Sequence, residues 1–190
     1  MKKQAIEKSL CLLALLVLAG CNQNKSPEAQ KEKSAKKASC EITSQSIGSR
    51  LLGKVSLGDT KEAILKKIPT ADIGYVTDGE GVEYMVITFG GITVYSWEND
   101  FLEVQDAVCT TTAGASVGMT IEQLEKIYGR VKRVETNGVN AFEDVVFERS
   151  PKNVWFKGYD LGEFSDDRSE VHVTKKFKPS GVIDDIVVTK

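Results

Sequence analysis

Apolar residues follow three different patterns along this chain of 190 residues. Residues 10–19 are apolar without interruption, whereas the apolar positions in 60–68 and 120–128 recur at helical spacing. From 83 to 108, apolar and polar residues alternate, and this period of two is typical of half-buried strands. The pattern predicts an apolar N-terminal segment followed by a body of short helices and strands.

The two helical segments are copies of one motif, 60 residues apart. Residues 55–68 and 115–128 share Ser, Gly, Thr, Glu and Lys in register, and most of their apolar positions correspond. Each copy places a glycine shortly before Thr60 or Thr120 and a glutamate two residues after it. A threonine in this position is a common helix N-cap, and the helix dipole favours a carboxylate in the first turn. We therefore expect two short capped helices that begin at equivalent threonines.

Segments with strand character follow each helix. They are 83–89, 92–97 and 101–108 after the first helix, and 141–148, 153–157, 170–178 and 182–189 after the second. A short capped helix followed by an antiparallel β-meander, used twice, predicts an α+β fold with the helices packed on one face of the sheet.

These patterns divide the chain into four parts. We assign 1–20 to a signal peptide, 21–39 to a lipidated flexible tether, 40–110 to a first α+β repeat and 111–190 to a second. The tether is rich in Lys, Ser, Ala, Gln and Glu and has no aromatic or β-branched residue, so it lacks the apolar surface that would order it.

The N-terminal segment has the layout of an export signal. A basic start and an apolar run precede Leu18-Ala19-Gly20-Cys21, which resembles the lipobox of bacterial lipoproteins. The run is too short to span a bilayer. The resemblance implies that Cys21 carries a thioether-linked diacylglycerol and an acyl chain such as palmitate. Asn22, where aspartate would favour inner-membrane retention, implies the outer membrane, with the periplasmic face favoured over the cell surface.

The four cysteines then sort by position. Cys11 leaves with the signal and Cys21 takes the lipid, so Cys40 and Cys109 remain together in an oxidising compartment. We expect them to form a disulfide that closes a loop of about 70 residues, which the chain-entropy model values at about 4 kcal/mol. The alternative is two unrelated thiols.

Charge limits the partners. Without residues 1–20 the chain has 22 basic and 26 acidic side chains, and residues 40–190 alone carry a net charge of −7. An acidic body argues against nucleic acid, whose phosphates need clustered Lys and Arg. The lysines of 22–39 either contact anionic lipid head groups or only aid solubility.

Catalytic and metal-binding patterns are weak. His172 is the sole histidine and falls on the polar side of an expected strand. The acidic segment Asp160–Glu170 offers carboxylates for a cation such as Ca²⁺ but lacks EF-hand spacing. Asp184 and Asp185 are adjacent and therefore face opposite sides of a strand. We expect no enzyme, no cofactor and no metal.

Aromatic residues give the one indication of a binding surface. Tyr95 and Trp97 share one face of a strand, and Trp155 and Phe156 lie in the corresponding region of the second half. Together they could form an aromatic patch that anchors a partner. Core packing is the alternative for each of them.

The second helix entry carries a family resemblance. Residues 117–124, with Tyr128-Gly129 after them, resemble the entry shared by the β-lactamase-inhibitory protein fold and the small lipoprotein of the outer-membrane β-barrel assembly machinery. The two-copy arrangement over 41–190, with Ile47-Gly48 before the first copy, resembles the sigma-E-regulated envelope lipoproteins, which have no established activity. The resemblance implies a fold and no functional residues.

Two function classes follow from the whole sequence. The first is a membrane-anchored, periplasm-facing lipoprotein with a non-enzymatic binding or envelope-maintenance role toward a protein or cell-wall partner. The second is a protein inhibitor of an envelope-attacking hydrolase or toxin, because an acidic body suits a basic target.

Overall fold

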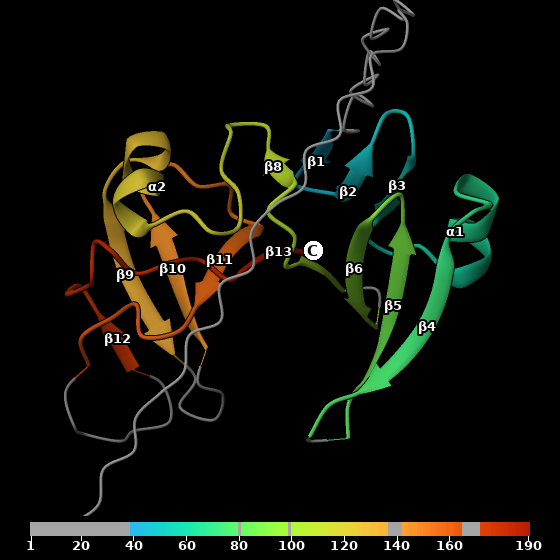
Figure 1. Cartoon of the computed structure of the whole chain (residues 1–190). Helices are drawn as coiled ribbons and strands as arrows, with labels where there is room; N and C mark the ends of the chain where they lie inside the picture. The colour runs from blue at the N-terminus through green and yellow to red at the C-terminus, as the bar shows by residue number, and fades with distance from the viewer. Residues whose placement is uncertain (1–38, 80, 99, 137–141, 165–171) are drawn as a thin grey trace, which may run out of the picture. The chain divides into compact units, whose positions relative to one another are not determined.

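The computed structural model describes residues 39–79, 81–98, 100–136, 142–164 and 172–190 (Figure 1). In these ranges the chain forms two helices, α1 (Lys61–Lys67) and α2 (Ile121–Tyr128). The strands of the first half are β1 (Cys40–Ile42), β2 (Ser46–Ser49), β3 (Gly53–Ser56), β4 (Asp72–Thr77), β5 (Glu83–Phe89), β6 (Ile92–Trp97), β7 (Phe101–Val104) and β8 (Cys109–Thr111). Those of the second half are β9 (Val131–Thr136), β10 (Glu143–Phe147), β11 (Val154–Gly158), β12 (His172–Thr174) and β13 (Asp185–Thr189).

The strands form two sheets. The smaller has the order β3-β2-β1-β8, and the larger has the order β12-β9-β10-β11-β13-β7-β6-β5-β4. In each half a helix precedes the strands that the half contributes to the larger sheet, and the last of these strands, β7 or β13, lies at the centre. These two strands pair antiparallel, with Val187 opposite Glu103. The two halves therefore share one continuous sheet, green strands from the first and yellow to red strands from the second in Figure 1.

The predicted α+β class is wrong. The described chain is mostly β, with thirteen strands and only two short helices, and it is not a sheet covered by helices on one face. The prediction counted the seven strands with visible alternation and missed β1, β2, β3, β4, β8 and β9. Four of these, β1, β2, β3 and β8, have only three or four residues and no readable period, and β4 is exposed along almost its whole length. The strands β1 and β8 also pair in parallel, which a purely antiparallel meander does not include.

The helix entries agree with the sequence prediction. The Thr60 side chain accepts from the N–H of Ala63 at 3.3 Å, and the Thr120 side chain accepts from the N–H of Gln123 at 3.3 Å. At the second helix entry the Gln123 side chain also accepts a hydrogen bond from the N–H of Thr120 at 2.9 Å, and the two bonds together form a capping box. Both N-cap predictions are confirmed.

Each helix contributes its apolar side to a core that strands dominate. Ile64 of α1 and Leu124 of α2 are fully buried, together with strand residues such as Val94 and Phe156. Tyr128 ends α2 with its hydroxyl 2.7 Å from that of Thr111, so a buried hydrogen bond joins α2 to β8. Helices of seven and eight residues depend on such packing because they are too short to be stable alone.

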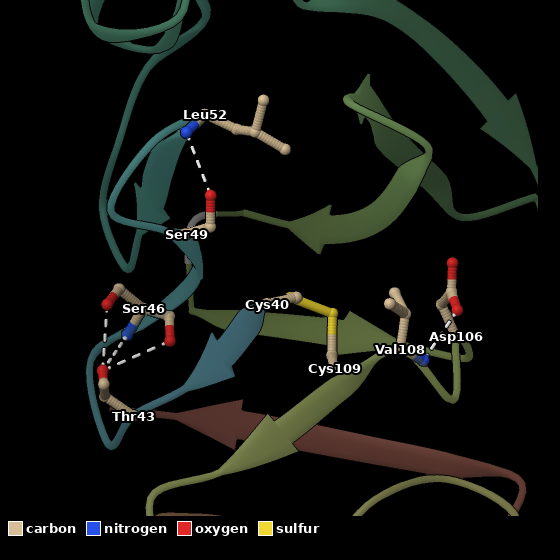
Figure 2. Close-up of a disulfide and its surroundings, with 8 residues drawn as sticks. All are labelled: Cys40, Thr43, Ser46, Ser49, Leu52, Asp106, Val108 and Cys109. Atoms are coloured by element: carbon tan, nitrogen blue, oxygen red, sulfur yellow. Dashed lines mark hydrogen bonds between the residues drawn. A yellow bond between two sulfur atoms is a disulfide. The ribbon is translucent and has the colours of Figure 1, made fainter. Parts of the chain in front are cut away.

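The predicted disulfide is present. Cys40 and Cys109 are joined, with Cα atoms 4.4 Å apart and a sequence separation of 69 residues (Figure 2). Both side chains are buried. Side-chain hydrogen bonds order the loops on either side: the Thr43 hydroxyl accepts from the N–H of Ser46, and the Asp106 carboxylate accepts from the N–H of Val108. The disulfide therefore links β1 to β8 between two loops that contain side-chain hydrogen bonds.

Candidate functional site

One face of the larger sheet packs in the core, and we call the other the open face. Successive side chains of a strand point to opposite faces, so alternation determines which residues lie on each face. On β6, Val94 and Ser96 are buried, whereas Tyr95 and Trp97 point the other way. The pairing carries this alternation across the sheet, because Tyr95 lies opposite Glu103 of β7 and Trp97 opposite Phe101. Aromatic and charged side chains are thus brought together on the open face.

A groove of about 700 Å³ runs over this face. One wall is an aromatic cluster in which the Phe101 ring lies 5.9 Å from Trp97 and 6.1 Å from Tyr84 between ring centroids. The opposite wall is the ring pair of Phe142 and Tyr159, 4.3 Å apart. The first wall comes from the first half of the chain and the second from the second half. The groove therefore exists only because β7 and β13 join the halves.

The four aromatic residues predicted from sequence have different positions. Tyr95 and Trp97 line the groove, as the shared-face argument expected. Trp155 is on the same open face but lines a separate cavity of about 240 Å³, and its indole N–H donates to the Thr189 hydroxyl at 3.2 Å. Phe156 is fully buried in the core, because it follows Trp155 on a strand and must face the other side. Phe156 is therefore not available to a partner.

The sequence did not predict four of the aromatic residues that line the groove: Tyr84, Phe101, Phe142 and Tyr159. Tyr84 and Phe101 belong to strands that were predicted, and their position opposite Trp97 depends on the strand register. Tyr159 and Phe142 lie just outside the strand ends of β11 and β10. A search for aromatics that alternate in phase with Trp97 would have found Phe101, but no local signal places Tyr159 opposite it.

A lateral row of charges crosses the larger sheet at the groove, and Lys157 is the member of the row that lines the groove. Asp144 of β10, Lys157 of β11 and Asp185 of β13 occupy successive register positions, with Lys157 opposite both carboxylates. Asp185 is 2% exposed, and one oxygen of each aspartate, Oδ1, is buried with no hydrogen-bond partner among the described residues. A buried oxygen without a hydrogen-bond partner lowers the stability of the folded state, so this row of charges destabilises the sheet.

Burial changes the acidity of these carboxyl groups. It raises the pKa of Asp185 to about 7, and the neighbouring Glu103 carboxylate adds to the shift. Hydrogen bonding from Gln105 and the positive charge of Lys157 act in the opposite direction but are weaker. Burial likewise raises the pKa of Asp144, against the effect of Lys157. The positive charge of Lys157 therefore does not offset the effect of burial on the nearby carboxyl groups.

Glu103 is the member of this group that reaches the groove. It lines the groove beside Lys157 and Gln105, and its carboxylate accepts from the Gln105 side chain at 3.2 Å. Glu103 and Asp185 lie on the two paired central strands, β7 and β13. Glu103 is opposite Val187, and Asp185 is two residues before Val187 on the same strand. A ligand in the groove would therefore meet a negatively charged floor between aromatic walls.

Residues considered for catalysis or metal binding are not assembled into a site. Asp184 is exposed while Asp185 is buried, as the alternation argument expected. His172 lies on the edge strand β12, with its ring 6.2 Å from that of Phe164. Asp160 pairs with Lys178. Among the described residues, no three His, Cys, Asp or Glu side chains are grouped so as to hold a metal ion.

Several sequence predictions fall outside the described residues. These are the lipidated Cys21, the signal and tether, and the part of the acidic segment that includes Asp166, Asp167 and Glu170. Within the described ranges, neither helix has the length and apolar character needed to traverse a bilayer.

Comparison with known proteins adds little. No protein-family model matches the chain, and no curated protein matches it. Among solved structures it is similar to the uncharacterized protein yfeY from Escherichia coli, with 12% sequence identity and a TM-score of 0.47 over 79% of this chain and 99% of that chain.

Proposed function

We propose that this protein is a lipid-anchored, non-enzymatic binding protein of the cell envelope that holds a partner in the groove on the open face of its larger sheet. The observation that carries the proposal is the groove itself. At about 700 Å³, it has aromatic walls from both halves of the chain and a few polar groups on its floor. Sites of this size and composition are typical of ligand and partner recognition.

The proposed anchor is the lipidated Cys21 at the outer membrane, on its periplasmic face. Support comes from the sequence. The lipobox-like motif ends at Cys21, and 18 residues without an aromatic or β-branched side chain separate Cys21 from Cys40. Such a segment spans roughly 25 Å as a random coil. That distance lets the groove face a protein or a cell-wall component near the membrane.

The groove is tested by a matched pair of tyrosine variants. Tyr95 lines the groove, whereas Tyr75 is 52% exposed on β4 outside the groove. Wild type, Tyr95→Ala and Tyr75→Ala, each carrying an affinity tag, are used to capture partners from solubilised envelopes after cross-linking. We expect one partner to be recovered with wild type and Tyr75→Ala and lost with Tyr95→Ala. Equal recovery by all three would reject the groove as the binding site.

A second candidate is a protein inhibitor of an envelope-attacking hydrolase or toxin. The net charge of −7 over residues 40–190 favours it, because an acidic surface complements a basic enzyme. Recovery of a hydrolase in the same capture, with loss of its activity on addition of wild type but not Tyr95→Ala, would select this candidate.

A further inference from the structure

We propose that the groove binds a cationic side chain, an arginine or a lysine of a protein partner, between its aromatic walls, with the charge at the Glu103 carboxylate and near the buried Asp185. This inference rests on the proposed function and adds the chemistry of the partner. It depends on three observations about the groove: its charge, its unpartnered oxygens and its walls.

The charge at the groove floor is not balanced within the protein. Lys157 lies between Asp144 and Asp185 in the strand register, and its positive charge acts on both carboxyl groups. Glu103 lines the groove beside it. Arg133, on a neighbouring part of the same sheet, is bonded to Glu135 at 2.8 Å and so compensates another carboxylate. Lys157 is the one positively charged side chain among the described residues that line the groove, so a cationic ligand would offset the remaining negative charge.

The unpartnered oxygens indicate where that cation acts. Oδ1 of Asp185 is buried without a hydrogen-bond partner, and Glu103 accepts one bond from Gln105 while lining the groove. A guanidinium presents five donors in a planar fork, which suits the Glu103 carboxylate that lines the groove. Binding would bring a donor to the Glu103 carboxylate and a compensating charge to Asp185. The raised pKa of Asp185 is consistent with a floor that lacks this charge.

The walls fit the same ligand. Tyr84, Trp97 and Phe101 form a cluster with ring separations near 6 Å on one side of the floor. An arginine or lysine that reaches Glu103 passes these rings, whose faces attract cations within about 6 Å. An uncharged glycan would also stack on the rings but would leave the carboxylates uncompensated.

The test uses two acetylated, amidated tripeptides, Ala-Arg-Ala and Ala-citrulline-Ala, which differ in charge but barely in shape. The chain has two tryptophans, so its indole N–H signals can be assigned with Trp155→Phe and followed by NMR. We expect the arginine peptide to shift the Trp97 signal saturably and the Trp155 signal little. The citrulline peptide should bind at least about tenfold more weakly, since a charge-assisted bond is worth about 1.4 kcal/mol more than a neutral one.

Variants locate the effect. Glu103→Gln and Asp185→Asn should each reduce or abolish the preference for arginine over citrulline, whereas Asp184→Asn, the same change at the exposed neighbour, should preserve it. Equal binding of the two peptides, no Trp97 shift with either, or tighter binding of a neutral N-acetylglucosamine trimer would each overturn the inference. These outcomes are distinct from failure of the proposed function, which is a partner still captured by Tyr95→Ala.

Discussion

Cys40 lies directly opposite Cys109 in the parallel pairing of β1 and β8, and a disulfide joins them. The first predicted consequence is a large contribution to stability. Cys40→Ser should lower the free energy of unfolding by about 4 kcal/mol, because the bond closes a loop of about 70 residues in the unfolded chain. Urea unfolding of the wild type with and without dithiothreitol provides the check. The reduced wild type should unfold like the variant, and a midpoint unaffected by reduction would contradict the prediction.

The second prediction concerns the two helix entries. Thr60→Ala and Thr120→Ala should each cost about 0.5–2 kcal/mol, because each removes the hydroxyl that caps the first turn. The losses should be similar, because the reciprocal bond at the second entry is donated by the backbone N–H of residue 120, which alanine keeps. Thermal or urea unfolding measures both, and Thr120→Ser should restore most of the loss because it keeps the hydroxyl. Partner binding should fall only as folding falls. A Thr120→Ala protein with normal stability and no binding would show that the entry is a functional site.

The two helix entries could be predicted from the sequence because an N-cap depends only on neighbouring residues. The glycine, the threonine and the first helical turn lie within a few residues of one another. The disulfide was also predictable, since removal of Cys11 and Cys21 leaves one pair. The fold class was not. Strands as short as β1 and β8 are held by partners far away in sequence, and three residues cannot display a period.

The candidate site shows the same division. The sequence predicts that Tyr95 and Trp97 share a face, because alternation along one strand is local. It does not predict the groove, which depends on the pairing of Val187 with Glu103 across the two halves. It also placed Phe156 with Trp155, although alternation puts one of any two neighbours in the core.

The third prediction uses the backbone of β2. Gly48 has φ of +150°, and a Cβ there would lie 2.3 Å from the carbonyl oxygen of Gly53 and 2.7 Å from Cα of Lys54. Gly48→Ala should therefore cost roughly 3 kcal/mol or more, because two backbones must separate. Gly118 also has positive φ, but a Cβ there meets nothing within 4 Å, so Gly118→Ala should cost only about 1 kcal/mol of conformational strain. Similar urea midpoints for the two variants would refute the close-approach argument.

The fourth prediction concerns the proposed anchor. Cys21→Ser should give a soluble or unprocessed protein, since covalent lipid is the anchor that the sequence indicates and acyl chains contribute about 0.8 kcal/mol per buried CH₂. Membrane fractionation and intact mass of the expressed variant are the measurements. A variant that stays in the membrane fraction with the mass of the mature lipidated protein would exclude lipidation at Cys21.

The fifth prediction is a pH dependence that originates at Asp185. Its pKa is about 7 in the folded protein against an ordinary value of 3.8, so the folded state holds more protons between these values. The contribution of Asp185 to stability is therefore present at low pH and is lost as pH rises from about 4 to about 7. The charged groups that face it include Glu103 on β7 and Lys157 on β11.

Asp185→Asn isolates this effect, because an amide does not titrate and leaves every other group in place. The variant should be more stable than wild type at pH 8, by roughly 2–4 kcal/mol, and the advantage should shrink steadily toward pH 4. Urea unfolding at half-unit steps of pH gives the difference directly. Asp184→Asn is the matched control: its carboxylate is exposed, so its difference from wild type should stay within about 0.5 kcal/mol at every pH. If Asp185→Asn showed the same flat difference as Asp184→Asn, the buried carboxylate would already be compensated, and the groove floor would have no need of a cation from a partner.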